Sequence, residues 1–550
     1  HMSARRQRQM CIRDRLMNGF LQDYLNENDI QFEDWSININ NQDGFGDYSS
    51  NIALKLSKQL KKSPIKIANR IANHKNNLSD IFTISASEPG FINFHISDNY
   101  YLKILDQILK KGENFGKKKK LNKSANVEFV SCNPTGPLTV GHGRQAILGD
   151  MVSNILTWNG YDVTREYYYN DAGKQMRVLA ESCYAKYAQQ IGKKVEMPEN
   201  GYIGAYLDEI ASKIVDNHGK NLDSDDPIFR DFTEKEIFSD IKKTLESIGI
   251  QFDVFSKEGT FYENGAIDNV LKEFREKGLS YEKDGAVWFK TSSLGKEEDK
   301  VLVKSSGEPT YRLPDIAYHA DKVDRGFDLI VDIFGADHID TYPDVLLGLK
   351  SLDKKTAHIK VVIHQFVTIK RSGEIVKMST RKANFITLDE LKDQFSQDII
   401  RYFFIMRGAN SHLDFDLDLA KDESEKNPVY YLQYANARIS NLLTRYDKEV
   451  SGDEKIDLTL LNKKDEIALA KLLSEFPDKM EEVLKSLEPR KIATYLEEVA
   501  AAYHKFYGNH KVIDTQNLAL SASRKKLCEA TKIILKNGFS ILGISAPERM

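Results

Sequence analysis

One histidine in a glycine-rich turn is the first residue in this sequence whose surroundings suggest chemistry. The stretch VEFVSCNPTGPLTVGHGRQAILGD (127–150) places His142 between Gly141 and Gly143, after a short apolar run and before a helical pattern. Such a succession predicts a strand, a turn and a helix, with the Gly-His-Gly step at the helix start. Unpaired N–H groups and the positive end of the helix dipole favour a phosphate there. His142 can donate to a phosphate oxygen as charge builds on it.

This pattern is not specific when it is taken alone. It lacks the spacing of a P-loop, which requires Gly-x-x-x-x-Gly-Lys followed by Ser or Thr. The segment from Asn133 to Pro137 could equally be an ordinary turn, with His142 as a surface residue at a helix start. Both interpretations stay open at this point.

The elements around the turn indicate an α/β domain. From Val127 to about residue 420, the short apolar runs VEFV, VWF, LIVDIF and VVIHQFV alternate with amphipathic segments of helical length. Such alternation favours a largely parallel sheet, which binds ligands at the carboxyl ends of its strands. GADH (335–338) follows LIVDIF directly, so we expect it at that edge; a plain strand-ending turn is the alternative.

The flanking sequence predicts two further domains. The N-terminal part mixes a helical pattern, IALKLSKQL (52–60), with the strand-like FINFHIS (91–97), and a lysine-rich linker runs from Lys110 to Ser124. After Asn427, a plausible N-cap, and Pro428, nearly all of the sequence has a helical pattern. We predict an α+β domain at 1–120, an α/β domain at 121–425 with an insertion at about 175–282, and an α-helical domain at 426–550.

Composition excludes several classes of protein. The 550 residues carry a net charge of -3, which argues against a uniformly basic surface that coats nucleic acid. No apolar run approaches the length of about 18 residues that a membrane-spanning helix needs. The four cysteines lie far apart, without a Cys-x-x-Cys pair, and so indicate neither a disulfide framework nor a zinc site. We expect a cytoplasmic protein with no structural metal.

Several motifs resemble one family of enzymes. NPTGPLTVGHGR is similar to the His-x-Gly-His motif of class I aminoacyl-tRNA synthetases, and VKMSTRKANFITL (376–388) to their Lys-Met-Ser-Lys-Ser motif. REYYYNDAGKQ, PTYRLPDIAYHADKVDRGFDLIVDIFGADH, NPVYYLQYANARI and the terminal GISAPERM resemble arginyl-tRNA synthetases of the bacterial type. The resemblance extends from Gly46 to the last residue. It implies a Rossmann-like catalytic domain between an N-terminal domain that binds the tRNA corner and an α-helical anticodon-binding domain.

The resemblance also implies a reaction. Enzymes of this family activate L-arginine with ATP and Mg²⁺, release pyrophosphate, and transfer arginine from arginyl-adenylate to the 3′-terminal ribose of tRNA(Arg). The expected partners are therefore tRNA(Arg), L-arginine and ATP, with no membrane. The expected oligomeric state is a monomer.

Candidate site residues follow from the resemblance, position by position. Those expected to act in catalysis are His142, Thr139, Lys377 and Arg381. Those expected to bind arginine are Glu128, Asn133, Tyr311, Asp315 and His338. Those expected to bind ATP are Gly141, His142, Gly143, Gly335, Asp337, Lys377, Met378 and Ser379. Those expected to bind tRNA are Phe91, Asn93, Tyr430, Tyr434 and Arg438.

Physical chemistry supports part of this assignment. A guanidinium always carries its charge and is best bound by carboxylates in a planar fork. If TYRLPDIAYH (310–319) is helical, its i, i+4 spacing puts Tyr311 and Asp315 on one face. Capping after Pro314 is the alternative role for Asp315.

The RNA-binding residues also have structural alternatives. Tyr430, Tyr434 and Arg438 recur every four residues and could stack unpaired bases. A tyrosine stripe at this spacing could instead belong to the core. Phe91 and Asn93 could lie on an edge strand whose aromatic residues simply pack.

Two positions depart from the motifs. Thr139 stands where the first histidine is usual, and Thr380 where the second lysine is usual. Arg381 or Lys382 could replace the missing charge. The departures leave open a tRNA-binding paralogue without activity. A class I ligase or nucleotidyltransferase for another acid is a further alternative, which Glu128 and Asp315 beside Tyr311 disfavour.

Overall fold

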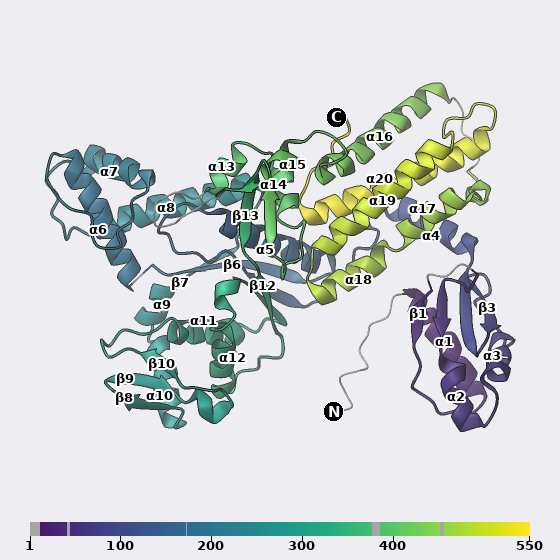
Figure 1. Cartoon of the computed structure of the whole chain (residues 1–550), viewed down its shortest axis with the longest axis horizontal. Helices are drawn as coiled ribbons and strands as arrows, with labels where there is room; N and C mark the ends of the chain where they lie inside the picture. Colours follow the sequence, from purple (N-terminus) through teal and green to yellow (C-terminus); the bar gives the residue numbers. More distant parts are fainter. Residues whose placement is uncertain (1–11, 41–43, 172, 377–385, 451–455) are drawn as a thin grey trace.

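The structure is a computed structural model that describes residues 12–40, 44–171, 173–376, 386–450 and 456–550. The molecule is elongated, with a central sheet domain between lobes of helices and a separate small sheet at one end (Figure 1). Among the described residues, no helix is both long and apolar enough to span a membrane.

The N-terminal part is a four-stranded antiparallel sheet with helices. Its strand order is β1-β2-β4-β3. The predicted helix at 52–60 and the predicted strand at 91–97 are confirmed as α2 and β4. Because β4 pairs on both sides, it is an inner strand and not the edge strand that the packing alternative assumed. The elements are α1 (Ile12–Glu27), β1 (Ile37–Ile39), β2 (Tyr48–Ser50), α2 (Ile52–Leu60), α3 (Pro64–Ala72), β3 (Phe82–Ser87) and β4 (Phe91–Ile96).

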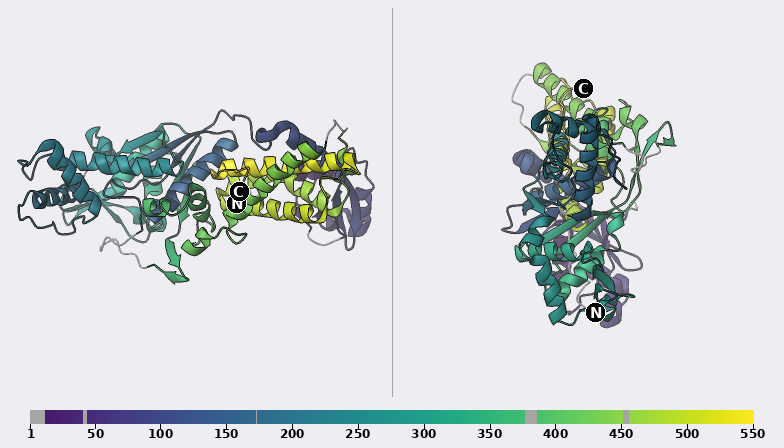
Figure 2. Two further views of the ribbon diagram at one scale, coloured as in Figure 1. Left: turned by 90° about the horizontal axis from the view of Figure 1, so that it is seen from above. Right: turned by 90° about the vertical axis from the view of Figure 1, so that its left-hand side faces the viewer.

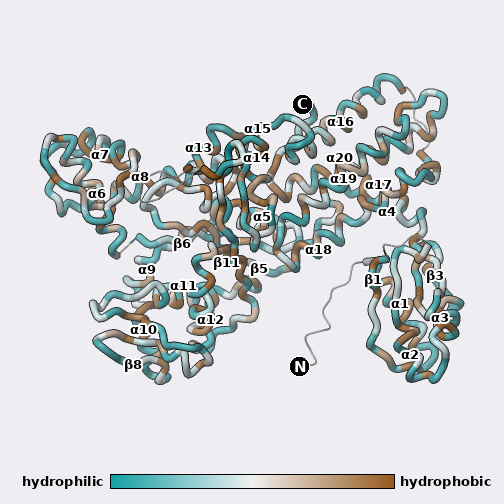
Figure 3. Tube along the Cα trace, viewed as in Figure 1, coloured by the Kyte–Doolittle hydropathy of each residue, from teal (hydrophilic) through white to brown (hydrophobic). Residues whose placement is uncertain are grey.

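A five-stranded parallel sheet forms the centre of the molecule, as predicted. Its order is β12-β11-β5-β6-β7, so the chain progresses outward in opposite directions from β5. Open sheets of this kind bind ligands at the carboxyl ends of the strands where the order reverses, here β5 and β11. Figure 3 shows hydrophobic segments gathered around these two strands. The strands are β5 (Ser124–Glu128), β6 (Asp162–Tyr169), β7 (Val254–Lys257), β11 (Leu329–Gly335) and β12 (Ile359–His364), and the helix α5 (Val140–Trp158) follows β5.

The range 175–282, predicted as one insertion, returns to the main sheet at β7. Three helices, α6 (Gly173–Gln190), α7 (Ala205–His218) and α8 (Ile228–Ser247), stand between β6 and β7 and project from one end of the molecule (Figure 1). A second group follows β7. It contains α9 (Glu258–Glu263), α10 (Ala266–Glu276), β8 (Ser280–Lys283), β9 (Ala286–Phe289), β10 (Lys300–Val303), α11 (Arg312–Asp324) and α12 (Tyr342–Ser351).

Two apolar runs do not form the strands that were predicted from them. VWF lies in β9, which belongs to an antiparallel sheet of order β10-β9-β8, outside the parallel sheet. VVIHQFV is split between β12 and β13 (Val367–Arg371), which lie in different sheets. The buried Arg144 binds the backbone between these two strands, where its Nη1 donates to the carbonyl of Gln365 at 2.6 Å. Burial alone cannot reveal such a break, because both halves of the run are apolar.

Smaller elements connect the sheet domain to the C-terminal helices. β13 pairs with both other strands of its sheet, in the order β14-β13-β15. These elements are β14 (Glu374–Ile375), α13 (Leu388–Lys392), α14 (Gln397–Phe403), β15 (Leu413–Asp416) and α15 (Leu417–Lys421).

The C-terminal part is helical, as predicted. Asn427 is the N-cap of α16, and its side chain accepts a hydrogen bond from Val429 N at 3.0 Å. The α4 helix (Asp98–Lys111) packs against α17 and α20, so part of the predicted linker is helical and joins this bundle. Figure 2 shows the bundle extending toward the N-terminal sheet. The helices are α16 (Pro428–Glu449), α17 (Lys464–Ser474), α18 (Phe476–Ser486), α19 (Arg490–Asn509) and α20 (Leu518–Leu542).

A buried arginine joins three parts of the chain. Arg401 of α14 donates to Leu542 O and to Ile248 O, both at 3.0 Å, and forms an ion pair with Asp150 of α5. A guanidinium with several fixed acceptors is held in one orientation. The ends of α8 and α20 are therefore anchored beside the helix that starts at the glycine-rich turn.

Candidate active site

A cavity of about 950 Å³ opens at the carboxyl ends of β5 and β11, the edge that the fold predicts. It is large enough for a substrate of nucleotide size. Many of the predicted site residues line it, although they come from separate segments. These are Glu128, Asn133, Thr139, Gly141, His142, Tyr311, Asp315, Gly335, Asp337 and His338.

Gly143 was predicted to bind ATP, but it does not line this cavity. An added Cβ would lie 2.9 Å from Leu388 Cδ1, so the glycine allows close packing under the turn. Its N–H already donates to Thr139 O at 3.0 Å and is not available to a phosphate. The predicted residues Lys377, Met378, Ser379 and Arg381 lie outside the described residues, as do Thr380 and Lys382. Their roles stay predictions.

The start of α5 holds His142 in a defined protonation state. Thr139 N donates to His142 Nδ1 at 3.2 Å, so this ring nitrogen is an acceptor. Burial lowers the pKa of His142, although the charge of Asp337 opposes the shift, and the ring is neutral at pH 7. In a neutral imidazole with Nδ1 as acceptor, Nε2 carries the proton. The residue is thus a neutral donor at the edge of the cavity, beside a helix N-terminus.

Asp315 and Tyr311 lie at the start of α11, as the spacing predicted. Tyr311 is the N-cap residue and is 67% exposed, whereas Asp315 is half-buried. Burial raises the pKa of Asp315 to about 6, and the nearby Glu128 carboxylate acts in the same direction. The helix turn is held by His319 Nδ1, which donates to the carbonyl of Asp315 at 2.8 Å.

The raised pKa of Asp315 predicts a pH dependence. If the carboxylate binds a cationic amino acid, protonation of the free enzyme below pH 6 competes with binding. The KM for that amino acid should rise about tenfold per pH unit below 6 and level off above about pH 7. Measuring the KM for arginine and for ATP between pH 5 and 8 checks this. A KM for arginine that is constant down to pH 5 would contradict the assignment, and the KM for ATP serves as the internal control.

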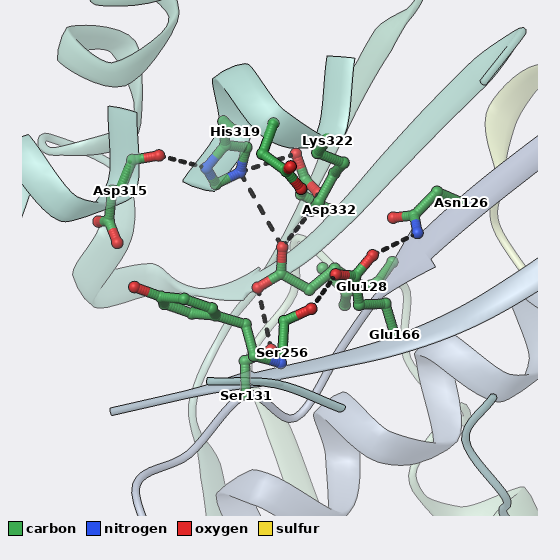
Figure 4. Close-up of polar contacts among 12 residues, drawn as sticks. Asn126, Glu128, Ser131, Glu166, Ser256, Asp315, His319, Lys322 and Asp332 are labelled. Atoms are coloured by element: carbon green, nitrogen blue, oxygen red, sulfur yellow. Dashed lines mark hydrogen bonds and ion pairs between the residues drawn. The ribbon is translucent and has the colours of Figure 1, made fainter. Parts of the chain in front are cut away.

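Glu128 also lines the cavity, but its carboxylate is already bound (Figure 4). Ser131 Oγ donates to Oε1 at 2.9 Å, and the Lys322 ammonium binds Oε2. The same ammonium lies 2.8 Å from Asp332 Oδ1. Glu128 is therefore a fixed acceptor whose charge is partly offset by the Lys322 ammonium that it shares with Asp332. Its role in binding arginine stays a prediction.

Asn133 and His338, which were also predicted to bind arginine, both line the cavity. Asn133 Nδ2 donates to Gln175 Oε1 at 2.6 Å, and its Oδ1 accepts from Asn170 N at 2.9 Å. The exposed His338 stacks on Phe334 with ring centres 5.0 Å apart. Its Nε2 is 3.8 Å from Asp337 Oδ2.

Several residues of the site gave no recognisable signal in the sequence. Glu258, at the end of β7, accepts hydrogen bonds from Tyr168 OH at 2.9 Å and from Asn170 Nδ2 at 2.7 Å. Its burial raises its pKa to about 7. On α11, the spacing of Asp315, His319 and Lys322 at i, i+4 and i+7 could have indicated one polar face. Nothing in the sequence indicated which strands this face meets.

The predicted RNA-binding residues differ in accessibility. Tyr430 and Tyr434 stack with centres 6.2 Å apart, and the Arg438 guanidinium lies 4.9 Å from the Tyr434 ring. All three are half-buried, so the stripe keeps an exposed face. Asn93, by contrast, is 3% exposed, and its amide donates to Ser87 Oγ at 2.9 Å. The role of Asn93 stays a prediction.

A metal cage of protein ligands does not form at the described part of this site. Glu128, His319 and Asp332 approach closely enough to share an ion, but the Lys322 ammonium already binds both carboxylates. Mg²⁺ commonly keeps its waters and is bound through substrate phosphates. The binding of Mg²⁺ stays a prediction.

Comparison with known proteins agrees with this fold. The family described as "tRNA synthetases class I (R), catalytic domain" matches residues 104–402, which defines the class as a class I aminoacyl-tRNA synthetase. The "Arginyl tRNA synthetase N terminal domain" matches residues 12–96, and the "DALR anticodon binding domain" matches residues 432–550. The chain belongs to the arginyl-tRNA synthetase family.

Individual relatives cover almost the whole chain. An arginine–tRNA ligase of Desulfotalea psychrophila is 46% identical over 94% of this chain and 95% of its own length. One of Chlorobaculum tepidum is 46% identical over 96% of this chain and 99% of its own. The arginyl-tRNA synthetase structure of Thermus thermophilus is similar in fold, with a TM-score of 0.75 and 18% identity over 98% of this chain and 100% of that one.

Proposed function

We propose that this chain activates L-arginine with ATP and transfers it from arginyl-adenylate to the 3′-terminal ribose of tRNA(Arg). The observation that supports the proposal is that one cavity is lined by Asp315, by Glu128 and by the start of α5. Asp315 supplies the negative charge for a guanidinium, and Glu128 supplies a fixed acceptor. This arrangement suits an amino acid with a planar, permanently charged end group.

The adenylate-forming step needs alignment and charge stabilisation, without a protein nucleophile. The arginine carboxylate attacks the α-phosphorus of ATP, and the bond to pyrophosphate breaks. His142 Nε2–H donates to phosphate oxygens as their charge grows, beside the helix N-terminus. Asp337, at the end of β11, binds the ribose of ATP. Mg²⁺, bound through substrate and water rather than by a protein cage, would neutralise part of the charge on the phosphates.

Transfer requires tRNA on the same enzyme. The stripe of Tyr430, Tyr434 and Arg438 on α16 offers stacked rings and a guanidinium to unpaired bases. Phe91 of β4 is half-buried and is the candidate for stacking at the tRNA corner. We propose a cytoplasmic monomer; the free thiols of Cys132, Cys183 and Cys528 fit a reducing compartment.

Arginine-dependent exchange between ATP and pyrophosphate, measured with tRNA present, tests the proposed function. Exchange that requires arginine and is not supported by other amino acids is the expected result. Exchange with a different amino acid would favour another class I ligase. Loss of exchange while tRNA still binds would favour the inactive paralogue that Thr139 and Thr380 left open.

Replacing Tyr434 with alanine is expected to raise the KM for tRNA. Stacking of a base on an aromatic ring contributes about 1–3 kcal/mol, so the KM should rise between about fivefold and a hundredfold. The KM values for arginine and ATP should change little. Aminoacylation kinetics measure all three. Tyr262→Ala removes an exposed ring from α9, away from this stripe, and is the control; an equal effect of both variants would contradict the role of Tyr434.

A further inference from the structure

Lys322 is a buried cation behind the wall of the cavity. It lies on α11 seven residues after Asp315, and its side chain is 0% exposed. Its ammonium binds Glu128, lies 2.8 Å from Asp332 Oδ1, and is 4.5 Å from the centre of the Tyr318 ring. Burial alone would lower the pKa of Lys322, but the two carboxylates raise it above its usual value. Lys322 therefore keeps its positive charge, and its two carboxylate partners fix the position of its ammonium.

Glu128 stands between this cation and the substrate. It lines the cavity, whereas Lys322 does not. Its two oxygens are held from different directions, Oε1 by Ser131 Oγ at 2.9 Å and Oε2 by Lys322 (Figure 4). The carboxylate can therefore present only one orientation to a ligand. Lys322 acts on the substrate only through Glu128.

The groups packed around Lys322 form a closed charge network. Asp332 Oδ2 accepts from Tyr342 OH at 3.0 Å and lies 3.4 Å from His319 Nε2, which itself is 4.0 Å from Glu128. Truncating one partner of such a network exposes the remaining charges to an unfavourable environment. Removing any cation from such a position would therefore lower stability. A loss of stability alone cannot show a specific role for Lys322, which must be seen as a change in substrate selectivity.

Charge compensation distinguishes the two cationic amino acids. A primary ammonium is a compact, strongly hydrated charge that needs net negative potential to replace its water. A guanidinium is weakly hydrated and binds planar acceptors in fixed directions. A carboxylate bound from behind by a lysine keeps its directional acceptor atoms but offers less net charge than a carboxylate without such a partner. It therefore suits arginine better than lysine.

On the basis of the proposed function, we propose that Lys322 is a positioning residue for amino-acid selectivity. By binding Glu128 from behind, it fixes the orientation of that carboxylate and offsets part of its charge, because Asp332 shares the same ammonium. The cavity wall then favours a guanidinium over an ammonium. Asp315 remains the ionic partner of the substrate. Lys322 determines whether Glu128 favours a guanidinium or an ammonium.

Lys322→Met tests this inference, because methionine keeps most of the length and removes the charge. Arginine-dependent ATP–pyrophosphate exchange with tRNA gives the KM for arginine, and competition gives the Ki for lysine. The ratio of Ki for lysine to KM for arginine should fall at least about tenfold, while the KM for ATP stays within about threefold. The ratio falls if the Glu128 carboxylate stays ionised without its lysine partner, because the affinity for lysine then increases. The ratio also falls if this carboxylate takes up a proton, because the affinity for arginine then decreases more than the affinity for lysine.

Two further variants separate selectivity from folding. Lys322→Met with Asp332→Asn removes the cation together with one carboxylate, so it serves if the single variant does not fold. Arg325→Met is the matched control: Arg325 directly follows α11 and binds the buried Glu166 at 2.8 Å, and neither residue lines the cavity. This control should lose stability, measured as Tm, without a change in the lysine-to-arginine ratio.

The outcomes are distinct. A ratio that falls in both Lys322 variants but not in Arg325→Met supports the inference. An unchanged ratio and an unchanged KM for arginine in the folded Lys322 variants overturn it, as does an equal fall in Arg325→Met. If the unmodified enzyme shows no arginine-dependent exchange, the proposed function fails and this inference with it. That result is seen before any variant is compared.

Discussion

Asp315→Asn is expected to lower kcat/KM for arginine about 1000-fold. Asparagine keeps the shape of the side chain and removes the charge, so the guanidinium loses its ionic partner in the cavity. Breaking a buried charged pair costs about 3–5 kcal/mol, and each 1.4 kcal/mol is about a factor of ten. The loss should appear mainly in the KM for arginine, with the KM for ATP changed less than about threefold.

Asp321→Asn is the matched control for this experiment. Asp321 lies on the same helix, is half-exposed, and pairs with Arg325 at 3.3 Å outside the cavity. It should leave arginine use almost unchanged. If Asp315→Asn instead raises the KM for ATP and leaves arginine dependence intact, Asp315 does not bind the guanidinium.

His142→Ala should lower kcat about 100- to 1000-fold, the effect expected for loss of one preorganised donor to a developing charge. The change should appear in the rate of adenylate formation in a single turnover. The KM values for ATP and arginine should change much less, because the donor acts most strongly on charge that forms during the reaction. A large rise in the KM for ATP without a change in kcat would show that His142 only binds the ground state.

Thr139→Val separates the effect of the Thr139 hydroxyl from that of the Thr139 backbone N–H. Valine keeps the backbone N–H that donates to His142 Nδ1 and removes the hydroxyl. If the hydroxyl donates to a phosphate, kcat falls by a similar factor. If the backbone N–H is the important group, Thr139→Val stays within about tenfold of the unmodified enzyme and His142→Ala does not.

The sequence predicted those parts of the fold that depend on local patterns. The helix at 52–60, the strand at 91–97 and the cap at Asn427 all depend on neighbouring residues, and all are confirmed. The parallel sheet followed from the alternation of apolar runs and amphipathic segments. VWF and VVIHQFV were assigned wrongly because an apolar run indicates burial but not the sheet to which a strand belongs. Only long-range contacts, such as the one from Arg144 to Gln365, decide this.

The candidate site was predictable to a similar extent. Glu128, Asp315 and His142 were identified from motifs at the ends of a strand and the starts of two helices, and they line one cavity. Their roles stay predictions. Lys322 was missed because a lysine in a helical pattern is usually on the surface, and its burial depends on two carboxylates, from β5 and β11. Ion pairs between residues that lie far apart in the chain leave no local pattern in the sequence.

The junction at Arg401 has a consequence for how the enzyme can be divided. Its guanidinium takes acceptors from the last helix, from the helical projection beside the sheet, and from the helix that carries His142. The end of α20 is consequently bound, through Arg401, beside the helix α5 that carries His142. Truncation before α20 would remove one acceptor of this buried guanidinium, so we expect the shortened chain to be less stable.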